Sequence, residues 1–520
     1  MRNTFFRRCS GFPAKPSLIP RQFSRTIPVR DQAKLARCTA QKRISQLIFY
    51  LVFMNSDLTI KKVLHMIENG EASAEEIRQG FLREIELHDK KLNAYLEVYK
   101  GDEKAEKSGG ALAGIPCAVK DSILVEGKHC TAGSKILSNY TAAYDATAVS
   151  KLKAAGAVIL GKTNLDEFAM GTTGENSAFG PTLNPYDDKR IAGGSSCGSV
   201  AAVAADMAVF ALGSDTGGSI RMPASLCGVV GLKPTYGRVS RHGLIAMASG
   251  FDQIGPITKT VEDAAIVLNV ISGRDPMDST SSPAEVPDFV KELDKPVKGL
   301  RAAVPKEYFG EGISPDIKIS VEKAISVLGK LGIYVDYVNI PTAEYALAAY
   351  YILVPSEVSS NLARYDGIKY GKVSSDGDSY IDSYLHTRAE FLGPEVRRRV
   401  IIGTYTLSAG YYDAYYLKAQ KVRTLLRKDF EKVYKNFDVI VGPVAPMVAP
   451  KIGELTDPLS AYMADMFTVQ ANLVGIPAIS VPCGTVLIDG KELPVGFQIM
   501  GRHFDEATIL RVAHAYELSR

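Results

Sequence analysis

The sequence lacks the cysteine spacings that mark structural metal sites and disulfide frameworks. Its 520 residues include only seven cysteines, at positions 9, 38, 117, 130, 197, 227 and 483, and no two of them form a C-x-x-C pair. Zinc sites and disulfide-stapled small domains need such paired spacings. We therefore expect reduced, mostly buried thiols and no metal site.

Long hydrophobic runs and phosphate loops are also missing. The apolar run at positions 47–53 is far shorter than the ~20 residues that cross a bilayer, and no other stretch reaches that length. We therefore expect a soluble protein without a membrane association. The pattern G-x-x-x-x-G-K-[ST], which cradles nucleotide phosphates, occurs nowhere in the chain.

Acidic residues are absent from positions 1–30, which hold seven Lys and Arg together with several Ser and Thr. This composition is typical of mitochondrial transit peptides. We therefore predict that residues 1–54 are an N-terminal extension containing a transit peptide, and that residues 55–520 form the folded domain in the mitochondrial matrix. A start at Met54, with the preceding residues not translated, remains the alternative.

The charge of the chain is unevenly distributed. Residues 1–54 carry eleven Lys and Arg against the single acid Asp31, a charge of +10, so the chain's total of +4 leaves −6 for residues 55–520. A protein that grips RNA phosphates over a large surface is more often basic. The remaining composition, 46% hydrophobic and 23% charged, is that of a globular protein with ample material for a core.

The periodicity of the chain predicts an α/β fold. Ser73 and Glu76 fit a capping box, and an apolar stripe at three- and four-residue steps follows it. Short apolar runs bounded by Gly or Pro then alternate with helical stretches, as buried strands do. These runs are 114–120, 157–161, 439–442, 478–482 and 495–501. Residues 290–345 look like a βα stretch, and residues up to about 435 look helical. Because no linker or repeat interrupts the chain, we expect one large domain with a central mixed β-sheet flanked by helices.

Three segments carry residue types suited to chemistry: Gly114–Asp121, which contains Lys120, the serine-rich run Gly193–Ser199, and the run Gly213–Arg221. Glycines beside serines allow tight turns whose N–H groups converge on one point and stabilise an anion. A lysine at the end of an apolar run can be buried, which lowers its pKa and makes it a base. Each segment alone is more often an ordinary loop or strand end.

A second interpretation comes from Gly194-Ser-Ser196-Cys-Gly198, which matches the G-x-S-x-G nucleophile elbow. It would make Ser196 the nucleophile, with His503 or His514 as its base. The elbow requires a strand directly before it. Residues 184–190 read instead as a turn-rich loop, so this match is weak.

The run from Gly193 to Tyr236 resembles the signature of the amidase signature family. The Gly-Gly-Ser-Ser-x-Gly-Ser and Asp-Thr-Gly-Gly-Ser-Ile-Arg-x-Pro-Ala pieces are specific together, and so are the spacings of 75 residues from Lys120 to Ser195 and 24 from Ser195 to Ser219. The similarity covers about residues 57–515. Within the family the chain is most similar to A subunits of glutamyl-tRNA(Gln) amidotransferases, on the runs 161–170, 231–240, 359–367 and 407–413.

The resemblance implies the catalytic roles. Ser219 is the nucleophile, Lys120 is the base, and Ser195, which follows a cis peptide bond in the family, bridges the two. The backbone N–H groups of Thr216, Gly217 and Gly218 form the oxyanion hole.

The resemblance also implies a site for free glutamine outside the signature. Arg399 binds the α-carboxylate, Asp465 binds the α-ammonium, and Tyr350 contacts the substrate. Without this resemblance, Arg399 and Asp465 would read as ordinary surface charges. Three positions depart from the usual pattern: Cys197 stands where Gly is commoner, Gly174 where a polar residue is usual, and Met222 where Gln is frequent.

The resemblance implies two partner chains, a B subunit together with a small third subunit. Ammonia released from glutamine passes to the B subunit, which uses ATP and Mg²⁺ to convert mischarged Glu-tRNA(Gln) to Gln-tRNA(Gln). No cofactor is expected in this chain, which agrees with its missing phosphate loop. Two functions remain open: this glutaminase subunit, or a stand-alone amidase for another small or acyl amide. A non-enzymatic scaffold is a distant third.

Overall fold

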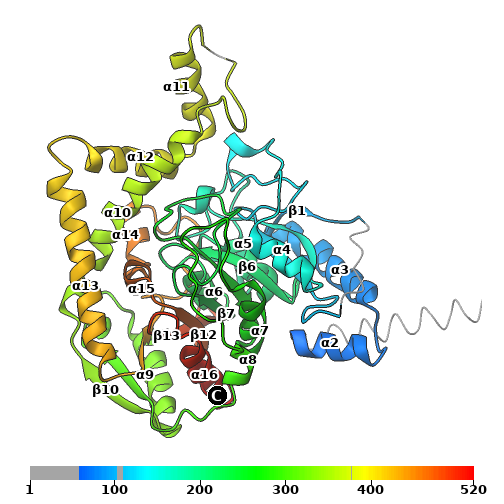
Figure 1. Ribbon diagram of the computed structural model, residues 1–520, viewed down its shortest axis with the longest axis vertical. Coiled ribbons are helices and arrows are strands. Elements are labelled where there is room, and N and C mark those ends of the chain that lie inside the picture. The colour runs from blue at the N-terminus through cyan, green and yellow to red at the C-terminus, as the bar shows by residue number, and fades with distance from the viewer. Residues whose placement is uncertain (1–57, 102–108, 376) are drawn as a thin grey trace, which may run out of the picture. The chain divides into compact units, whose positions relative to one another are not determined.

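The computed structural model describes residues 58–101, 109–375 and 377–520. The predicted transit peptide, Cys9 and Cys38 therefore lie outside the described residues. The described residues form one compact unit. At its centre lies an eleven-stranded sheet with the strand order β1-β3-β2-β6-β8-β7-β12-β13-β11-β9-β10 (Figure 1).

The sheet is mixed, as predicted. The groups β3-β2-β6 and β11-β9-β10 pair in parallel, whereas the strands between β6 and β11 pair antiparallel, as does the edge strand β1 with β3. The strands are β1 Tyr95–Val98, β2 Pro116–Lys120, β3 Val158–Thr163, β6 Phe210–Asp215, β7 Val230–Lys233, β8 Gln253–Thr258, β9 Arg301–Pro305, β10 Tyr334–Val338, β11 Val439–Pro443, β12 Ala478–Ile488 and β13 Lys491–Gly501.

All five apolar runs singled out in the sequence form strands of this sheet, namely β2, β3, β11, β12 and β13. The prediction of a turn-rich loop at residues 184–190 is wrong. That segment forms a hairpin of β4 Leu183–Asn184 and β5 Asp187–Ile191, which stands apart from the main sheet. The turn residues that suggested a loop are the residues that reverse the chain between two short strands.

Fifteen α-helices are described. They are α2 Ile60–Glu68, α3 Ala74–Leu92, α4 Thr147–Ala154, α5 Cys197–Ala204, α6 Arg221–Leu226, α7 Val261–Ile271, α8 Phe289–Glu292, α9 Pro315–Lys330, α10 Ala346–Asn361, α11 Tyr380–Phe391, α12 Pro394–Leu407, α13 Lys418–Tyr434, α14 Pro458–Met463, α15 Val469–Val474 and α16 Glu506–Glu517. The predicted capping box is present at the start of α3, where Ser73 Oγ accepts from the Glu76 N–H and the Glu76 carboxylate accepts from the Ser73 N–H.

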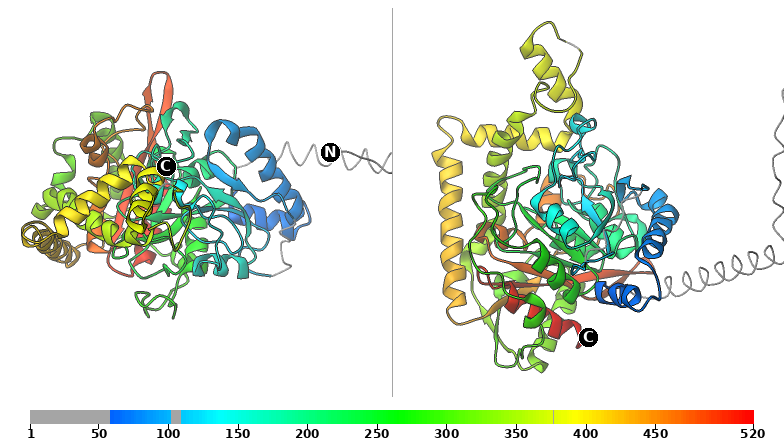
Figure 2. Two further views of the ribbon diagram at one scale, coloured as in Figure 1. Left: turned by 90° about the horizontal axis from the view of Figure 1, so that it is seen from above. Right: turned by 45° about the vertical axis from the view of Figure 1, so that its right-hand side comes forward.

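The helices fall into two groups. Helices α5, α6, α7, α9 and α16 pack directly on the strands, whereas α10, α12 and α13 pack mainly on one another and on α15. Figure 2 shows this second group, coloured yellow-green to orange, lying together to one side of the sheet. The predicted helical region up to residue 435 corresponds to it, and the predicted βα stretch corresponds to β9, α9 and β10.

The thiols behave as predicted within the described residues. Cys117, Cys130, Cys197 and Cys227 are buried, Cys483 is partly buried, and none of these five forms a disulfide. No helix in the described part of the chain is both long and apolar enough to cross a membrane.

Candidate active site

The site begins at the carboxyl ends of two neighbouring parallel strands. Strands β2 and β6 pair in parallel, with Val119 opposite Leu212. Lys120 is the last residue of β2, and the glycine-rich turn 216–218 follows the last residue of β6. Because the ends of parallel strands meet at the same edge of a sheet, the fold brings together two motifs that are about a hundred residues apart.

Lys120 is fully buried among serine hydroxyls. Its Nζ lies 2.7 Å from Ser195 Oγ, 2.9 Å from Ser214 Oγ and 3.0 Å from Ser196 Oγ. Burial lowers the pKa of Lys120 to about 8, against the opposing effect of the carboxylates of Asp166 and Asp215. About a tenth of the molecules therefore carry a neutral amine at pH 7, and this form can accept a proton.

The hydrogen-bond donors and acceptors around Lys120 limit which hydroxyl can give its proton to the neutral amine. A neutral amine has two N–H donors and one lone pair, and three hydroxyls surround it. Ser196 Oγ donates its own proton to the carbonyl oxygen of Ser214, 3.2 Å away. Only Ser195 and Ser214 can therefore donate into the lone pair.

Ser195 is held between two segments. The Gly194–Ser195 peptide bond is cis. The Gly194 N–H donates to the Thr172 carbonyl (2.7 Å), and the Ser195 carbonyl accepts from the Asp166 N–H (3.3 Å). The next N–H, of Ser196, donates to the Ser219 carbonyl (3.2 Å). This last bond holds the serine-rich run against the turn that carries Ser219.

Ser219 differs in exposure from the other serines of the site. It is partly exposed, whereas Ser195, Ser196 and Ser214 are buried. Within the described residues its Oγ makes no hydrogen bond, so the bridge from Ser195 to Ser219 is not closed in this structure. The hydroxyl is therefore free to meet a ligand that enters the site.

The predicted oxyanion donors are not equivalent. The Gly218 N–H already donates to Asp215 Oδ1 at 2.9 Å. In the part of the chain that the structure describes, the N–H groups of Thr216 and Gly217 make no hydrogen bond. These two groups are available to an anion, and Gly218 instead helps to shape the turn.

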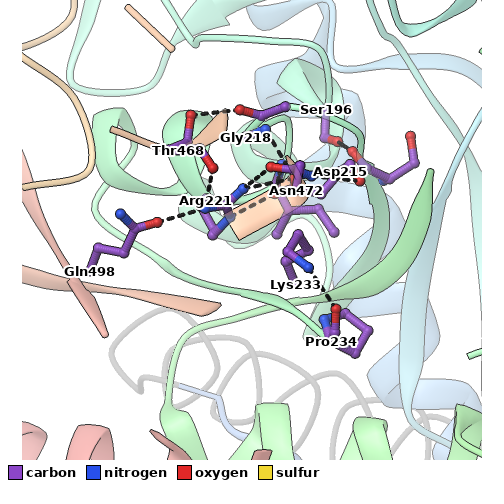
Figure 3. Close-up of polar contacts among 12 residues, drawn as sticks. Ser196, Asp215, Gly218, Arg221, Lys233, Pro234, Thr468, Asn472 and Gln498 are labelled. Atoms are coloured by element: carbon purple, nitrogen blue, oxygen red, sulfur yellow. Dashed lines mark hydrogen bonds and ion pairs between the residues drawn. The ribbon is translucent and has the colours of Figure 1, made fainter. Parts of the chain in front are cut away.

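A buried network fixes this turn from behind (Figure 3). Arg221 donates through Nε and Nη2 to the two oxygens of Asp215, each at 3.0 Å, and both side chains are fully buried. Burial alone would raise the pKa of Asp215, but the Arg221 guanidinium outweighs it and holds this pKa at about 2. Arg221 also donates to Asn472, Gln498 and the Thr468 carbonyl. The turn is therefore tied to α15 and β13.

The three predicted substrate residues lie around this turn. A Cβ atom at Gly217 would overlap the hydroxyl of Tyr350, which makes no hydrogen bond within the described residues. Asp465 is buried and accepts a hydrogen bond from the Tyr351 hydroxyl (2.8 Å). Burial raises the pKa of Asp465 to about 7, although the Tyr351 hydroxyl and Arg399 oppose this shift.

Arg399 projects from helix α12, and its guanidinium lies near two aromatic rings. Its Nε donates to Glu395 Oε1 (2.8 Å), and its guanidinium carbon lies 5.4 Å from the ring centroids of both Tyr351 and Tyr462. Its two Nη groups make no hydrogen bond to any described residue. Arg399 also lines a cavity of about 270 Å³ together with Tyr462, Thr172 and Thr173. A guanidinium held by one edge presents its other edge to a carboxylate.

Several residues of the site were missed in the sequence. Ser214 contacts Lys120, Tyr351 holds Asp465, and the Tyr462 hydroxyl donates to Glu395 at 2.7 Å. The Glu395–Arg399 pair had a local signal, because residues four apart share a helix face. The other contacts join segments far apart in the chain.

The nucleophile elbow does not assemble. His503 Nε2 lies 3.1 Å from the Val474 carbonyl, and His514 pairs with Glu517. Neither histidine contacts Ser196 within the described residues. The described residues contain no cluster of His, Cys, Asp and Glu arranged to hold a metal ion.

Two of the unusual positions face each other. Gly174 has a φ of +80°, and a Cβ atom there would lie 2.7 Å from Cys197 Cβ. Gly174 thus leaves the space that the Cys197 side chain occupies. Burial raises the pKa of the Cys197 thiol to about 12, so this thiol is inert.

A low-pKa amine held against serine hydroxyls, beside a turn with two open N–H groups, is an arrangement suited to acyl transfer. The chain belongs to the amidase family, whose sequence profile matches residues 76–510. The family predicted from the sequence is therefore confirmed, and with it the prediction of an amidase-type enzyme.

Comparison with individual proteins shows which members of the family the chain is similar to. The chain is 53% identical over 464 residues to the A subunit of the glutamyl-tRNA(Gln) amidotransferase of Halothermothrix orenii, covering 89% of this chain and 97% of that protein. It superposes on the crystal structure of the corresponding A subunit of Thermotoga maritima with a TM-score of 0.76 and 47% identity, covering 88% and 94% of the two chains. The peptide amidase of Stenotrophomonas maltophilia is more distant, with a TM-score of 0.73 and 31% identity over 90% and 97% of the chains.

Proposed function

We propose that this chain is the glutamine-hydrolysing A subunit of a tRNA-dependent amidotransferase. The observation that carries the proposal is the 2.7 Å contact between the buried amine of Lys120 and Ser195 Oγ, beside the open hydroxyl of Ser219. The likeness to A subunits of glutamyl-tRNA(Gln) amidotransferases supports the choice of substrate.

The first half of the reaction forms an acyl-enzyme. Ser219 Oγ attacks the side-chain amide carbon of glutamine, its proton moves to Ser195 Oγ, and the proton of Ser195 moves to Lys120 Nζ. The oxyanion is stabilised by the N–H groups of Thr216 and Gly217. Lys120 then returns a proton through Ser195 to the amide nitrogen, the carbon–nitrogen bond breaks, and ammonia leaves.

The second half restores the enzyme. Water attacks the acyl carbon, and its proton passes along the same path to Lys120. The bond to Ser219 Oγ breaks, Ser219 regains a proton, and glutamate leaves. Lys120 is thus base and acid in turn, a role that suits a pKa of about 8.

Recognition of free glutamine falls to the second group of residues. The open Nη edge of Arg399 binds the α-carboxylate, and Asp465 binds the α-ammonium. With its pKa near 7, Asp465 gains its charge in the pH range in which the substrate ammonium needs a partner. The Tyr350 hydroxyl, next to Gly217, contacts the bound substrate.

The released ammonia serves a second reaction on other subunits. We propose that a B subunit, using ATP and Mg²⁺, amidates Glu-tRNA(Gln) with it, and that a small third subunit joins the two larger ones. This chain takes part in protein biosynthesis through that complex and needs no cofactor of its own.

The proposed location is the mitochondrial matrix, on the basis of the acid-free, basic residues 1–30. A reporter fused to residues 1–60 should enter mitochondria. A cytosolic reporter would favour Met54 as the start.

The nucleophile is tested by two serine variants of the chain assembled with its B and third subunits. Ser219→Ala should abolish glutamate release from glutamine, with the fold intact by circular dichroism. Ser196→Ala removes one of three hydroxyls around Lys120 and should cost about tenfold at most, because one hydrogen bond is lost. An active Ser219→Ala together with an inactive Ser196→Ala would make Ser196 the nucleophile.

A stand-alone amidase is the second candidate, favoured by the 31% identity to a peptide amidase. It predicts slow glutamine turnover and faster turnover of a neutral amide, with no dependence on a B subunit. A glutaminase assay of the purified chain, with and without the B subunit, separates the two candidates.

A further inference from the structure

Glu167 is a buried carboxylate for which the proposed reaction has no use. It is 3% exposed and lies on the short 3-10 turn η2 Glu167–Ala169, within one of the runs that carry the family resemblance. Its Oε1 accepts a hydrogen bond from Ser134 Oγ. Its Oε2 accepts the backbone N–H of Gly393 at 2.8 Å, from a residue 226 positions further along the chain.

Gly393 is the N-cap residue of helix α12, and this helix start has no side-chain cap of its own. Glycine offers no side-chain oxygen, and Pro394 at the first helical position has no N–H. The Glu167 carboxylate supplies both an acceptor and a negative charge at the positive end of the helix. A Cβ atom at position 393 would overlap this carboxylate, so glycine is what permits the contact.

Leu392 and Val396, at the start of α12, are buried in one hydrophobic cluster with Phe168, so Glu167 adds a polar contact to a packed helix start. A cavity of about 560 Å³ opens beside it, lined on one side by Lys135 and Glu167 and on the other by Gly393, Pro394 and Arg397. Apolar packing has no preferred direction, whereas the Gly393–Glu167 hydrogen bond does, so this bond fixes the position of the helix start relative to residue 167.

Because α12 is a continuous helix, the position of its start at Gly393 also determines the position of Arg399. A helix rises about 1.5 Å per residue, so Arg399 lies about 9 Å along the axis from Gly393. Between them stands Glu395, which accepts from both Arg399 Nε and the Tyr462 hydroxyl. A shift of the helix start therefore moves the guanidinium and its support together.

The residue before Glu167 fastens the other half of the site. The Asp166 N–H donates to the Ser195 carbonyl (3.3 Å), and Asp166 Oδ2 accepts the Gly174 N–H (3.0 Å). Two consecutive residues thus contact the two halves of the site: Asp166 contacts Ser195 through its backbone N–H, and Glu167 contacts the helix of Arg399 through its carboxylate.

We propose that Glu167 is a positioning residue that sets the distance between the serines and Arg399, and so selects substrates that carry an α-carboxylate. The proposal rests on the proposed function for the roles of Ser219 and Arg399. It adds that the distance is held by a residue that touches neither substrate nor reacting atoms.

The test compares two substrates in the assembled complex, glutamine and a primary amide of similar length without the α-groups. Glu167→Ala should raise KM for glutamine about tenfold, leave kcat within about twofold, and change kcat/KM for the neutral amide by no more than about twofold. Glu167→Gln keeps an acceptor for the Gly393 N–H and should restore KM to within about threefold of wild type. Burial raises the pKa of Glu167 to about 7, so the native carboxyl is itself partly neutral near pH 7 and its hydrogen bond matters more than its charge.

A double variant and a matched control complete the test. If Glu167 acts through Arg399, Glu167→Ala with Arg399→Ala should lose no more on glutamine than Arg399→Ala alone. Glu390→Ala removes an exposed carboxylate from the same cavity and should change nothing. Equal losses on both substrates, an additive double variant, or an unchanged KM in Glu167→Ala would overturn the proposal. A wild-type complex that fails to release glutamate from glutamine would instead refute the proposed function.

Discussion

The two halves of the site are built by different means. At the strand ends, Lys120, Ser195 and Ser219 are held by backbone hydrogen bonds, short side chains and the Asp215–Arg221 pair. Among the helices, Arg399 and Asp465 are held by other side chains, above all by the stacked rings of Tyr351 and Tyr462, whose centroids are 4.0 Å apart. The first half depends on glycines that allow close approach, and the second on bulky aromatic side chains.

This difference separates the residues proposed for the reaction from the residues proposed to select the substrate. Backbone N–H groups and buried hydroxyls act on any amide carbon that reaches them. Side chains projecting from helices can be exchanged without rebuilding the sheet. On the proposed function, the strand ends carry out the reaction, and Arg399 and Asp465 select the substrate.

The largest effect is expected from a substitution in the strand-end half of the site. Lys120→Ala should lower kcat for glutamine by on the order of 10³-fold or more, because the base and the nucleophile act as a unit. Lys120→Arg should be equally inactive, since a guanidinium does not give up its proton usefully. The neutral amide should lose activity in parallel. His503→Ala is the control and should remain active. Loss of activity in His503→Ala with Lys120→Ala unaffected would contradict the lysine scheme.

A smaller effect is expected from a substitution in the half of the site that the helices form. Arg399→Ala should reduce kcat/KM for glutamine by ten- to a hundredfold, because a charge-assisted hydrogen bond contributes about 1.5–3 kcal/mol. The neutral amide, which has no α-carboxylate, should lose far less. The measurement is kcat/KM for both substrates with the B subunit present. Equal losses on both substrates would mean that Arg399 supports the fold rather than the substrate.

The pH dependence should distinguish the halves without any substitution. Lys120 acts as a base only when neutral, so kcat/KM for either substrate should fall about tenfold per pH unit below a pKa of about 8. Asp465 must be ionised to bind the α-ammonium and becomes neutral below about 7. Below pH 7, glutamine should therefore lose a further factor of about ten per unit that the neutral amide does not lose. Parallel profiles for the two substrates would remove Asp465 from substrate binding.

The smallest effect concerns the tight packing of the strand-end half. Gly174→Ser should lower the free energy of unfolding by about 1–3 kcal/mol. The new side chain would overlap Cys197, and the serine backbone would have to adopt an unfavourable positive φ. Adding Cys197→Gly vacates the space and should recover part of the loss. Urea denaturation of the single and double variants measures both. A double variant less stable than Gly174→Ser would show that the two positions do not share this space.

The two halves also differ in how far the sequence predicted them. Lys120, Ser195 and Ser219 lie in short glycine- and serine-rich runs whose chemistry is visible locally. Strands β6, β7 and β8 were not recognised, because each contains or adjoins glycines and prolines that resemble loops in composition. The contact of Tyr351 with Asp465, 114 residues away, and that of Glu167 with Gly393 depend on how distant segments pack. No local pattern of residues specifies such contacts.

The difference in exposure between Ser219 and its neighbours has a consequence for chemical labelling. The three hydroxyls around Lys120, those of Ser195, Ser196 and Ser214, are buried, whereas Ser219 is partly open. An electrophile that mimics an amide carbonyl meets one oxygen atom, and the low-pKa amine beside it is sealed from reagents that acylate lysines. Mass spectrometry of the labelled protein should therefore find a single adduct on the peptide that contains residue 219, so that the number of competent sites can be counted before the natural substrate is known.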